Sequence, residues 1–267
     1  IALDKHDTVG IDIVNHCIND IFTCGAEPLF FMDYLAVASL DPTQAESIVS
    51  GVASACRDAD IALIGGETAE LPGIYAEGDY DLAGFVLGIV EKSKVINGSD
   101  IQAGDVILGL PSSWLHTNGY SLVRKIFGED VANLNKVYAK LGRTLGEELL
   151  EPHRCYYNTL KSALSYINGM AHITGGGLIE NVPRIVPDGL TARFDSSKWQ
   201  ISPIFELIQK IGDVNPIEMY RVFNMGLGMI VICSPSDVDK VKSAVSDTLI
   251  VGEVVKTEKS GSKVTID

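Results

Sequence analysis

The sequence lacks the cysteine patterns that stabilise secreted domains or bind structural zinc. Its five cysteines are an odd number, and none of them forms a CxxC pair, which argues against a disulfide framework and against a zinc site. Unpaired cysteines usually pack as small apolar side chains. We therefore expect free, buried thiols in a protein of the reducing cytoplasm.

Positive charge and long apolar runs are also scarce. The chain has 21 lysines and arginines against 35 aspartates and glutamates, and the resulting net charge of −14 opposes binding to nucleic acid or anionic lipid. No apolar run approaches the roughly 20 residues that cross a bilayer, and no basic start precedes an apolar leader. The sequence predicts a cytoplasmic protein with no nucleic-acid or membrane partner. Because it begins at Ile1 and not at a methionine, we also expect residues upstream.

The length of 267 residues favours two domains, because compact domains usually contain roughly 100–200 residues. Apolar density falls between Ser93 and Asp105, so we place one domain at 1–100 and the other at 101–267. Apolar spacing predicts helices at 11–24, 42–60, 122–127, 156–167, 203–211 and 238–245, and strands at 29–38, 61–64, 81–91, 106–110, 171–174, 190–194, 229–233 and 249–254. This pattern predicts an α+β fold, with helices layered on sheets in both domains.

Oxygen-bearing side chains gather in the first half. Asp12, Asn19 and Asp20 lie on the first predicted helix, and Glu67 with Thr68 follows a glycine pair at the end of a predicted strand. Hard oxygen ligands of this kind suit Mg²⁺ bound to a nucleotide, and glycines let a backbone approach a ligand closely. Helix caps and solvated surface acids would produce the same pattern, so spacing alone leaves both interpretations open.

Two glycine-containing turns in the second half precede predicted helices. The first runs from His116 to Arg124, and the second, at 172–177, carries three successive glycines after a histidine. Main-chain amides at a helix start can hold a phosphate, and a histidine that titrates near neutrality can move a proton. An ordinary strand-to-helix turn and a structural histidine are equally compatible with these segments.

Taken in order, five segments resemble phosphoribosylformylglycinamidine cyclo-ligases, which are also called aminoimidazole ribonucleotide synthetases. The segments are HDTVGID at 6–12, NDIFTCGAEPLFFMDYLA at 19–36, GGETAELPG at 65–73, HTNGYSLVR at 116–124 and HITGGGLIENVPR at 172–184, and EMYRVFNMGLGMIV at 218–231 extends the match. Trp114 stands where the family more often has glycine. The resemblance covers nearly the whole chain.

The resemblance implies an amino-terminal sheet domain that pairs into a homodimer and binds ATP, followed by a mixed-sheet domain that binds substrate. The implied reaction is the ATP-dependent closure of formylglycinamidine ribonucleotide to aminoimidazole ribonucleotide, with release of ADP and phosphate, in purine biosynthesis. It implies Mg²⁺ at Asp20 and Glu67, and ATP or its phosphates near both and near Asp12, Asn19 and Thr68. Either His172 or His116 is the implied base.

The substrate residues implied by the resemblance come from the two glycine-containing turns. They are Thr117, Asn118, Gly119, Ser121, Arg124, Thr174, Gly175, Gly176, Gly177 and Asn181. The family also has a glycine-rich nucleotide-binding segment that would lie just upstream of Ile1, so activity of the chain without it stays open. The alternatives are an ATP-using relative such as thiamine-monophosphate kinase, selenophosphate synthetase or a hydrogenase-maturation protein, and a non-catalytic dimerising fragment.

Overall fold

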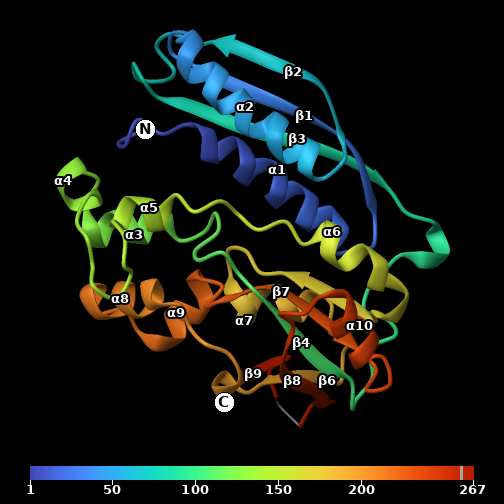
Figure 1. Cartoon of the computed structure of the whole chain (residues 1–267). Coiled ribbons are helices and arrows are strands. Elements are labelled where there is room, and N and C mark those ends of the chain that lie inside the picture. Colours follow the sequence, from blue (N-terminus) through green and yellow to red (C-terminus); the bar gives the residue numbers. More distant parts are fainter. Residues whose placement is uncertain (259–260) are drawn as a thin grey trace.

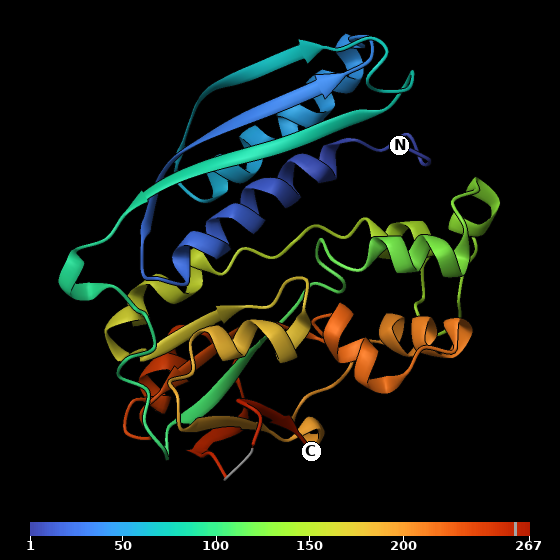
Figure 2. The same ribbon diagram turned by 180° about the vertical axis from the view of Figure 1, so that it is seen from behind.

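Two sheets divide the chain in the computed structural model, which describes residues 1–258 and 261–267 (Figure 1). The amino-terminal half contains α1 (Asp7–Phe22), β1 (Glu27–Val37), α2 (Pro42–Asp58), β2 (Ala62–Glu70), β3 (Tyr80–Ile89) and the 3₁₀ turn η1 (Lys92–Lys94). The strands follow the order β2-β1-β3, with β1 parallel to β2 and antiparallel to β3. Figure 2 shows α1 and α2 on the same face of this sheet.

The carboxy-terminal half contains a six-stranded sheet of order β5-β7-β4-β8-β6-β9. Its strands are β4 (Val106–Pro111), β5 (Gly169–His172), β6 (Leu190–Phe194), β7 (Leu227–Cys233), β8 (Leu249–Lys256) and β9 (Val264–Ile266). Its helices are α3 (Tyr120–Phe127), α4 (Val131–Leu134), α5 (Leu145–Leu149), α6 (Tyr157–Leu160), α7 (Gly177–Asn181), α8 (Pro203–Gly212), α9 (Pro216–Val222) and α10 (Val238–Ala244), with 3₁₀ turns η2 (Lys161–Tyr166), η3 (Val182–Arg184) and η4 (Ser196–Lys198).

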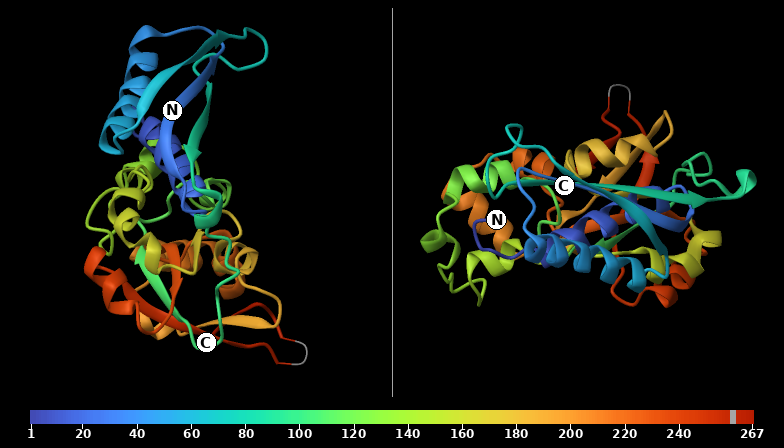
Figure 3. Two further views of the ribbon diagram at one scale, coloured as in Figure 1. Left: turned by 90° about the vertical axis from the view of Figure 1, so that its right-hand side faces the viewer. Right: turned by 90° about the horizontal axis from the view of Figure 1, so that it is seen from above.

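Helix α1 lies between the two halves, as the side view in Figure 3 shows. Its residues Val14, Ile18 and Phe22 are fully buried and belong to one apolar cluster with Leu108 of β4 and Val231 of β7. On the amino-terminal side, α1 approaches α2 closely, because Gly10 faces the backbone of Gly51. One continuous apolar core therefore fixes the position of α1 against both sheets.

The three-stranded sheet has one apolar face that no helix of the described residues covers. The side chains of Ile64, Phe85, Leu87 and Ile89 are about half exposed or more, although α1 and α2 cover the opposite face. Adjacent large apolar side chains on one open face are unusual for an isolated subunit and are typical of contact surfaces. In the part of the chain that the structure describes, no helix is long and apolar enough to cross a membrane.

The element predictions are largely confirmed, with one informative error. The cap at Asp41 is present, since its carboxylate accepts the amide hydrogens of Thr43 and Gln44 at the start of α2. The strand predicted to end at Ile64 instead continues as β2 through the glycine pair to Glu70. A register shift opposite Phe31 and Met32 leaves Ile64 without a partner in β1, and Gly65 and Gly66 pair with Met32 and Asp33. The glycines therefore continue a bulged strand and do not form a loop.

Candidate functional site

One face of α1 carries polar side chains that bind the extended segment 152–156 of the other half. The Asp12 carboxylate accepts the amide hydrogen of His153 at 2.8 Å, and Asn15 Nδ2 donates to the carbonyl of the same residue at 2.7 Å. One turn further, Asn19 Nδ2 donates to the carbonyl of Arg154 and Asn19 Oδ1 accepts from the amide of Tyr156. Asn19 is fully buried, so its amide serves to dock the two halves.

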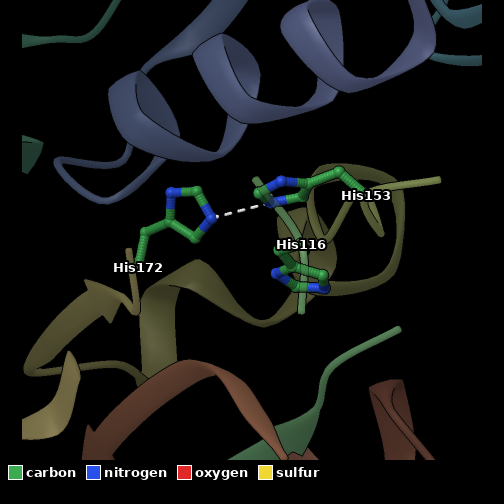
Figure 4. Close-up of side chains that lie close together, drawn as sticks. All are labelled: His116, His153 and His172. Carbon is green, nitrogen blue, oxygen red and sulfur yellow. Dashed lines mark hydrogen bonds between the residues drawn. The ribbon is translucent and has the colours of Figure 1, made fainter. Parts of the chain in front are cut away.

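Five side chains next to this segment form a closed ring of polar contacts. His172 Nδ1 lies 2.7 Å from Asp20 Oδ1, and its Nε2 lies 2.9 Å from Nε2 of His153 (Figure 4). His153 Nδ1 lies 3.5 Å from Thr117 Oγ1, which lies 2.7 Å from Nδ1 of His16. His16 Nε2 closes the ring at 3.3 Å from Asp20 Oδ2. The ring therefore joins α1 to three separate segments of the carboxy-terminal half.

The number of hydrogens in this ring defines its chemistry. Five contacts need five hydrogens, but an ionised Asp20, one hydroxyl and three neutral imidazoles supply only four. If Thr117 donates to His16, the contact between Thr117 and His153 has no hydrogen, and it is the longest of the five. One added proton completes every contact, whichever of the three imidazoles becomes charged. The neutral ring is thus an acceptor for a single proton.

Burial keeps two of the ring imidazoles, those of His153 and His172, unprotonated at neutral pH. It lowers the pKa of His153, and it lowers the pKa of His172 despite the opposing bond to Asp20. For Asp20 itself, burial would raise the pKa, but the bonds from His16 and His172 outweigh burial and lower it. Asp20 is therefore ionised, and the two buried imidazoles are neutral.

His116 stacks on the ring of His153 but stays outside the ring of contacts. The imidazole centroids lie 3.9 Å apart at 22° (Figure 4). The amide of Ser113 donates to Nε2 of His116 at 3.0 Å, so the neutral imidazole carries its hydrogen on Nδ1. This Nδ1 is buried and has no partner among the described residues. Burial lowers the pKa of His116 well below its ordinary value.

The backbone around His116 adopts conformations that ordinary residues avoid. Trp114 has φ 64° and His116 has φ 59°, both in the left-handed region. The carbonyl of Trp114 accepts hydrogen bonds from Ser112 Oγ and Asn224 Nδ2, and these bonds hold the turn. Glycine adopts such φ values without strain, so a glycine in place of Trp114 would fit this turn at lower cost.

His116, His153 and His172 each bring one ligating nitrogen within 4.8 Å of the others, a spacing that a metal ion could bridge. The hydrogen bond from the Ser113 amide opposes this interpretation, since Nε2 of His116 is already an acceptor and Nδ1 carries the hydrogen. Metal binding through Nδ1 would require a different tautomer and the loss of that bond. The hydrogen-bonded ring accounts for His153 and His172 without a metal ion.

The glycine turn after β5 lies beside the first turn. The backbone φ is 98° at Gly176 and 57° at Gly177, and Gly175 lies beside the side chain of Asn118. Asn181 Nδ2 donates to the carbonyls of Thr174, Gly175 and Gly177. Asn181 is thus buried beneath the turn and stabilises its shape. The Nδ2 atom of Asn118 is buried without a partner in the described part of the chain.

A cavity of about 490 Å³ opens beside the ring. Asp12, His116, Thr117 and Arg124 all line it, together with Tyr120. Its volume is in the range of small-molecule sites. Of the substrate residues suggested by the resemblance, Thr117 and Arg124 therefore lie on the wall. Gly119 shapes the start of α3 at φ 81°, and Ser121 is an exposed residue of the first turn of α3.

Glu67 and Asp20 do not come together in this chain. Glu67 pairs with Tyr34 in the strand register, on the opposite face from Phe31 and Leu35, which are buried toward the helices. Asp20 lies on α1 and contacts His172 of the other half. The shared Asp20–Glu67 site expected from the sequence is therefore not formed within one chain. Glu67 is exposed, and its Oε1 accepts only the amide of Thr68 among the described residues.

The sequence does not identify two members of the ring, His16 and His153, as site residues. His16 and Asp20 are four residues apart on α1, so helical spacing predicts their contact, but that spacing is common on helix surfaces. His153 lies in a segment without regular structure, and its partners are distant in sequence. No local signal marks it. All five thiols are free, as predicted, but only Cys56 and Cys233 are buried, and the other three are partly exposed.

Two family models match this chain, one for each half. Residues 1–90 match the family model described as AIR synthase related protein, N-terminal domain, and residues 102–265 match the C-terminal domain of the same description. Together the two models cover most of the chain.

Curated relatives with high identity share one description, phosphoribosylformylglycinamidine cyclo-ligase. The relative from Desulfitobacterium hafniense is 51% identical over 94% of this chain and 76% of its own length. Those from a Thermoanaerobacter species and from Bacillus cereus are 49% and 47% identical, over 96% and 99% of this chain and over 78% and 77% of their own lengths.

Solved structures with lower identity share the fold. A thiamine-monophosphate kinase from Stenotrophomonas maltophilia aligns with a TM-score of 0.70 at 17% identity, covering 97% of this chain and 79% of that one. The hydrogenase maturation protein HypE aligns with a TM-score of 0.71 at 16% identity, covering 97% and 78%. At such identities the likeness shows the architecture alone.

Proposed function

Because this chain belongs to the phosphoribosylformylglycinamidine cyclo-ligase family, we propose that the ring of histidines, Thr117 and Asp20 serves the cyclisation that defines the family. The reaction is the ATP-dependent closure of formylglycinamidine ribonucleotide to aminoimidazole ribonucleotide in purine biosynthesis, with ADP and phosphate as the other products. Phosphorylation converts the formyl oxygen into a good leaving group. An amidine nitrogen then attacks the formyl carbon and must lose a proton.

The single observation that supports this role is the missing hydrogen of the ring. A cyclisation that releases one proton needs an acceptor for one proton, and the neutral ring has one open contact, between His153 and Thr117. Thr117 also lines the cavity, so its hydroxyl connects a bound molecule with the buried imidazoles. The anion of Asp20 then stabilises the imidazolium at His172 or His16. His172 is thus the better of the two predicted bases, since His116 lies outside the ring.

The two turns supply the groups that would hold the ribose phosphate. Arg124 lines the cavity, and the unpartnered Nδ2 of Asn118 supplies a hydrogen-bond donor beside Gly175. Main-chain amides at the starts of α3 and α7 add further donors, with Gly119, Ser121, Gly176 and Gly177 around them. Thr174 and Asn181 would act by holding the second turn in shape.

ATP and Mg²⁺ belong to the amino-terminal half in this proposal. The exposed carboxylate of Glu67 fits a hard cation, because no positive side chain neutralises it in the described structure, and the neighbouring Thr68 would contact the nucleotide phosphates. Mg²⁺ bound there would neutralise phosphate charge during transfer. Asp20 already contacts two imidazoles, so we assign it to the ring. Residues 1–100 would thus bind nucleotide and 101–267 the substrate.

A homodimer and a cytoplasmic location complete the proposal. The open apolar face with Ile64, Phe85, Leu87 and Ile89 supports pairing between two copies through the three-stranded sheet, and Glu67 would then lie near the interface. Five free cysteines fit a reducing compartment. Sedimentation at micromolar concentration measures whether the chain forms a dimer, and a monomer would contradict the pairing.

The test of the catalytic role is ATP turnover stimulated by formylglycinamidine ribonucleotide. We expect His172→Gln to lose roughly 100-fold or more of the stimulated rate, because general bases typically contribute 10²–10⁴-fold. His6→Gln is the matched control, since His6 is also buried but contacts Tyr80 and Asp4 and is not a member of the ring. Equal stimulated rates in the two variants would show that His172 takes no part in the reaction.

A further inference from the structure

Asp12 is a carboxylate on the cavity wall without a positive partner. Its Oδ1 accepts the amide hydrogen of His153, and in the part of the chain that the structure describes it forms no ion pair. Burial raises its pKa to about 7, against the opposing effects of that bond and of His16. An isolated carboxylate at such a site is destabilised by desolvation until a cation reaches it.

Among the described residues around Asp12, His16 is the basic side chain whose charge lowers its pKa, but the ring nitrogens of His16 contact Thr117 and Asp20 instead of Asp12. His16 faces it from α1, Tyr120 from α3, and the imidazoles of His116 and His153 from the two loops. Burial keeps both of these loop imidazoles neutral. Arg124 also lines the cavity, but its guanidinium pairs with Glu129 at 3.2 Å. A bound cation is therefore the missing partner of Asp12.

We propose that Asp12 pairs with the cationic amidine of the substrate and makes the site select an amidine over the corresponding amide. This inference rests on the proposed function, in which the cavity binds formylglycinamidine ribonucleotide. An amidine is protonated in neutral water and presents two N–H groups in one plane, which a carboxylate can accept. The amide that has oxygen in place of the amidine nitrogen is neutral and presents a carbonyl oxygen, which a carboxylate repels.

The selection has a consequence for the order of reactions. A reaction that replaces the amide oxygen with nitrogen must supply this substrate, and its unreacted amide would compete for the same cavity. Discrimination by Asp12 would keep that amide out. The amidinium must lose one proton before its nitrogen can attack, and the paired carboxylate of Asp12, whose pKa is about 7, accepts that proton. The second proton, released on ring closure, then enters the ring through Thr117, which lines the same cavity.

Calorimetric titration of the full chain with the amidine ribonucleotide and with the matching amide ribonucleotide, without ATP, tests the pairing. Asp12→Asn retains an oxygen that accepts the amide of His153, so the fold should be preserved. We expect this variant to bind the amidine roughly 10- to 100-fold more weakly, the range for a hydrogen bond to a charged group, and the amide no more weakly than the wild type. Asp7→Asn, an exposed aspartate of the same helix, is the control and should match the wild type.

The outcomes separate the two claims. A wild-type chain that prefers the amidine, together with an Asp12→Asn chain that keeps the same preference, would overturn the role of Asp12 and leave the cavity assignment standing. A wild-type chain that binds neither ribonucleotide would overturn the cavity assignment, and the role of Asp12 with it. As a second measurement, amidine binding to the wild type near pH 7 should release protons to the buffer, because pairing ionises Asp12. Asp12→Asn should not release them.

Discussion

Replacement of Asp20 by Asn tests whether the essential base belongs to the ring. The wild-type carboxylate accepts from His172 at 2.7 Å and contacts His16 at 3.3 Å, and its charge raises the pKa of His172 against the effect of burial. Asparagine keeps one acceptor oxygen and removes the charge. The substitution should therefore lower the pKa of His172 and weaken it as a base.

The expected size follows from the energy of a charged hydrogen bond. Such bonds contribute about 1.5–3 kcal/mol, which corresponds to about one to two pH units. Asp20 is 54% exposed, so solvent screening favours the lower end of that range. The base acts when neutral, at pH values above its pKa. The acid limb of the rate profile should thus move down by about one pH unit, and the plateau should fall on the order of tenfold.

The assay is kcat/KM for the amidine ribonucleotide between pH 5 and pH 9, at saturating ATP. Asp7→Asn on the same helix is the control and should reproduce the wild-type profile. An Asp20→Asn profile whose acid limb stays at the wild-type pH would refute the reasoning, because the essential base would then not sense the charge of Asp20.

Two further predictions concern the stability of elements near the cavity. Gly119→Ala should lower the free energy of unfolding by about 2–4 kcal/mol, since a Cβ there meets Phe223 Cε1 at 2.1 Å and φ is 81°. Gly104→Ala, with φ 99° and open space around its Cβ, should lower it by only about 1 kcal/mol; equal losses in urea unfolding would show that the contact with Phe223 relaxes freely. Thr144→Ala should cost about 1 kcal/mol, because it removes the capping box of α5, and an unchanged thermal midpoint would contradict that value.

Local patterns predicted the elements that position the site. The aspartate and proline that begin α2 and the apolar spacing of α1 act within a few residues, so the sequence reveals them directly. The continuation of β2 through its glycine pair is not predicted, because the bulge at Ile64 and the pairing beyond it depend on the partner strand β1, which local spacing does not include. Glu67 consequently occupies the open face of a strand.

The ring itself depends on contacts that no sequence window contains. Thr117 and His172 were expected near the substrate, but their link through His153 joins three segments that are far apart in the chain. The proton capacity of the ring follows from counting hydrogens over all five members. That count requires the distances between side chains, which residue patterns do not give.

Because the polar face of α1 joins the two halves, the proton-accepting ring forms only at the last stage of folding. A chain whose two sheets have each formed, but whose halves have not yet met along residues 152–156, already contains all the ring side chains and still lacks the closed ring beside the cavity. Asn15 and Asn19 complete that meeting through backbone bonds. Immature chains would thus remain inert toward a reactive phosphorylated intermediate until assembly is finished.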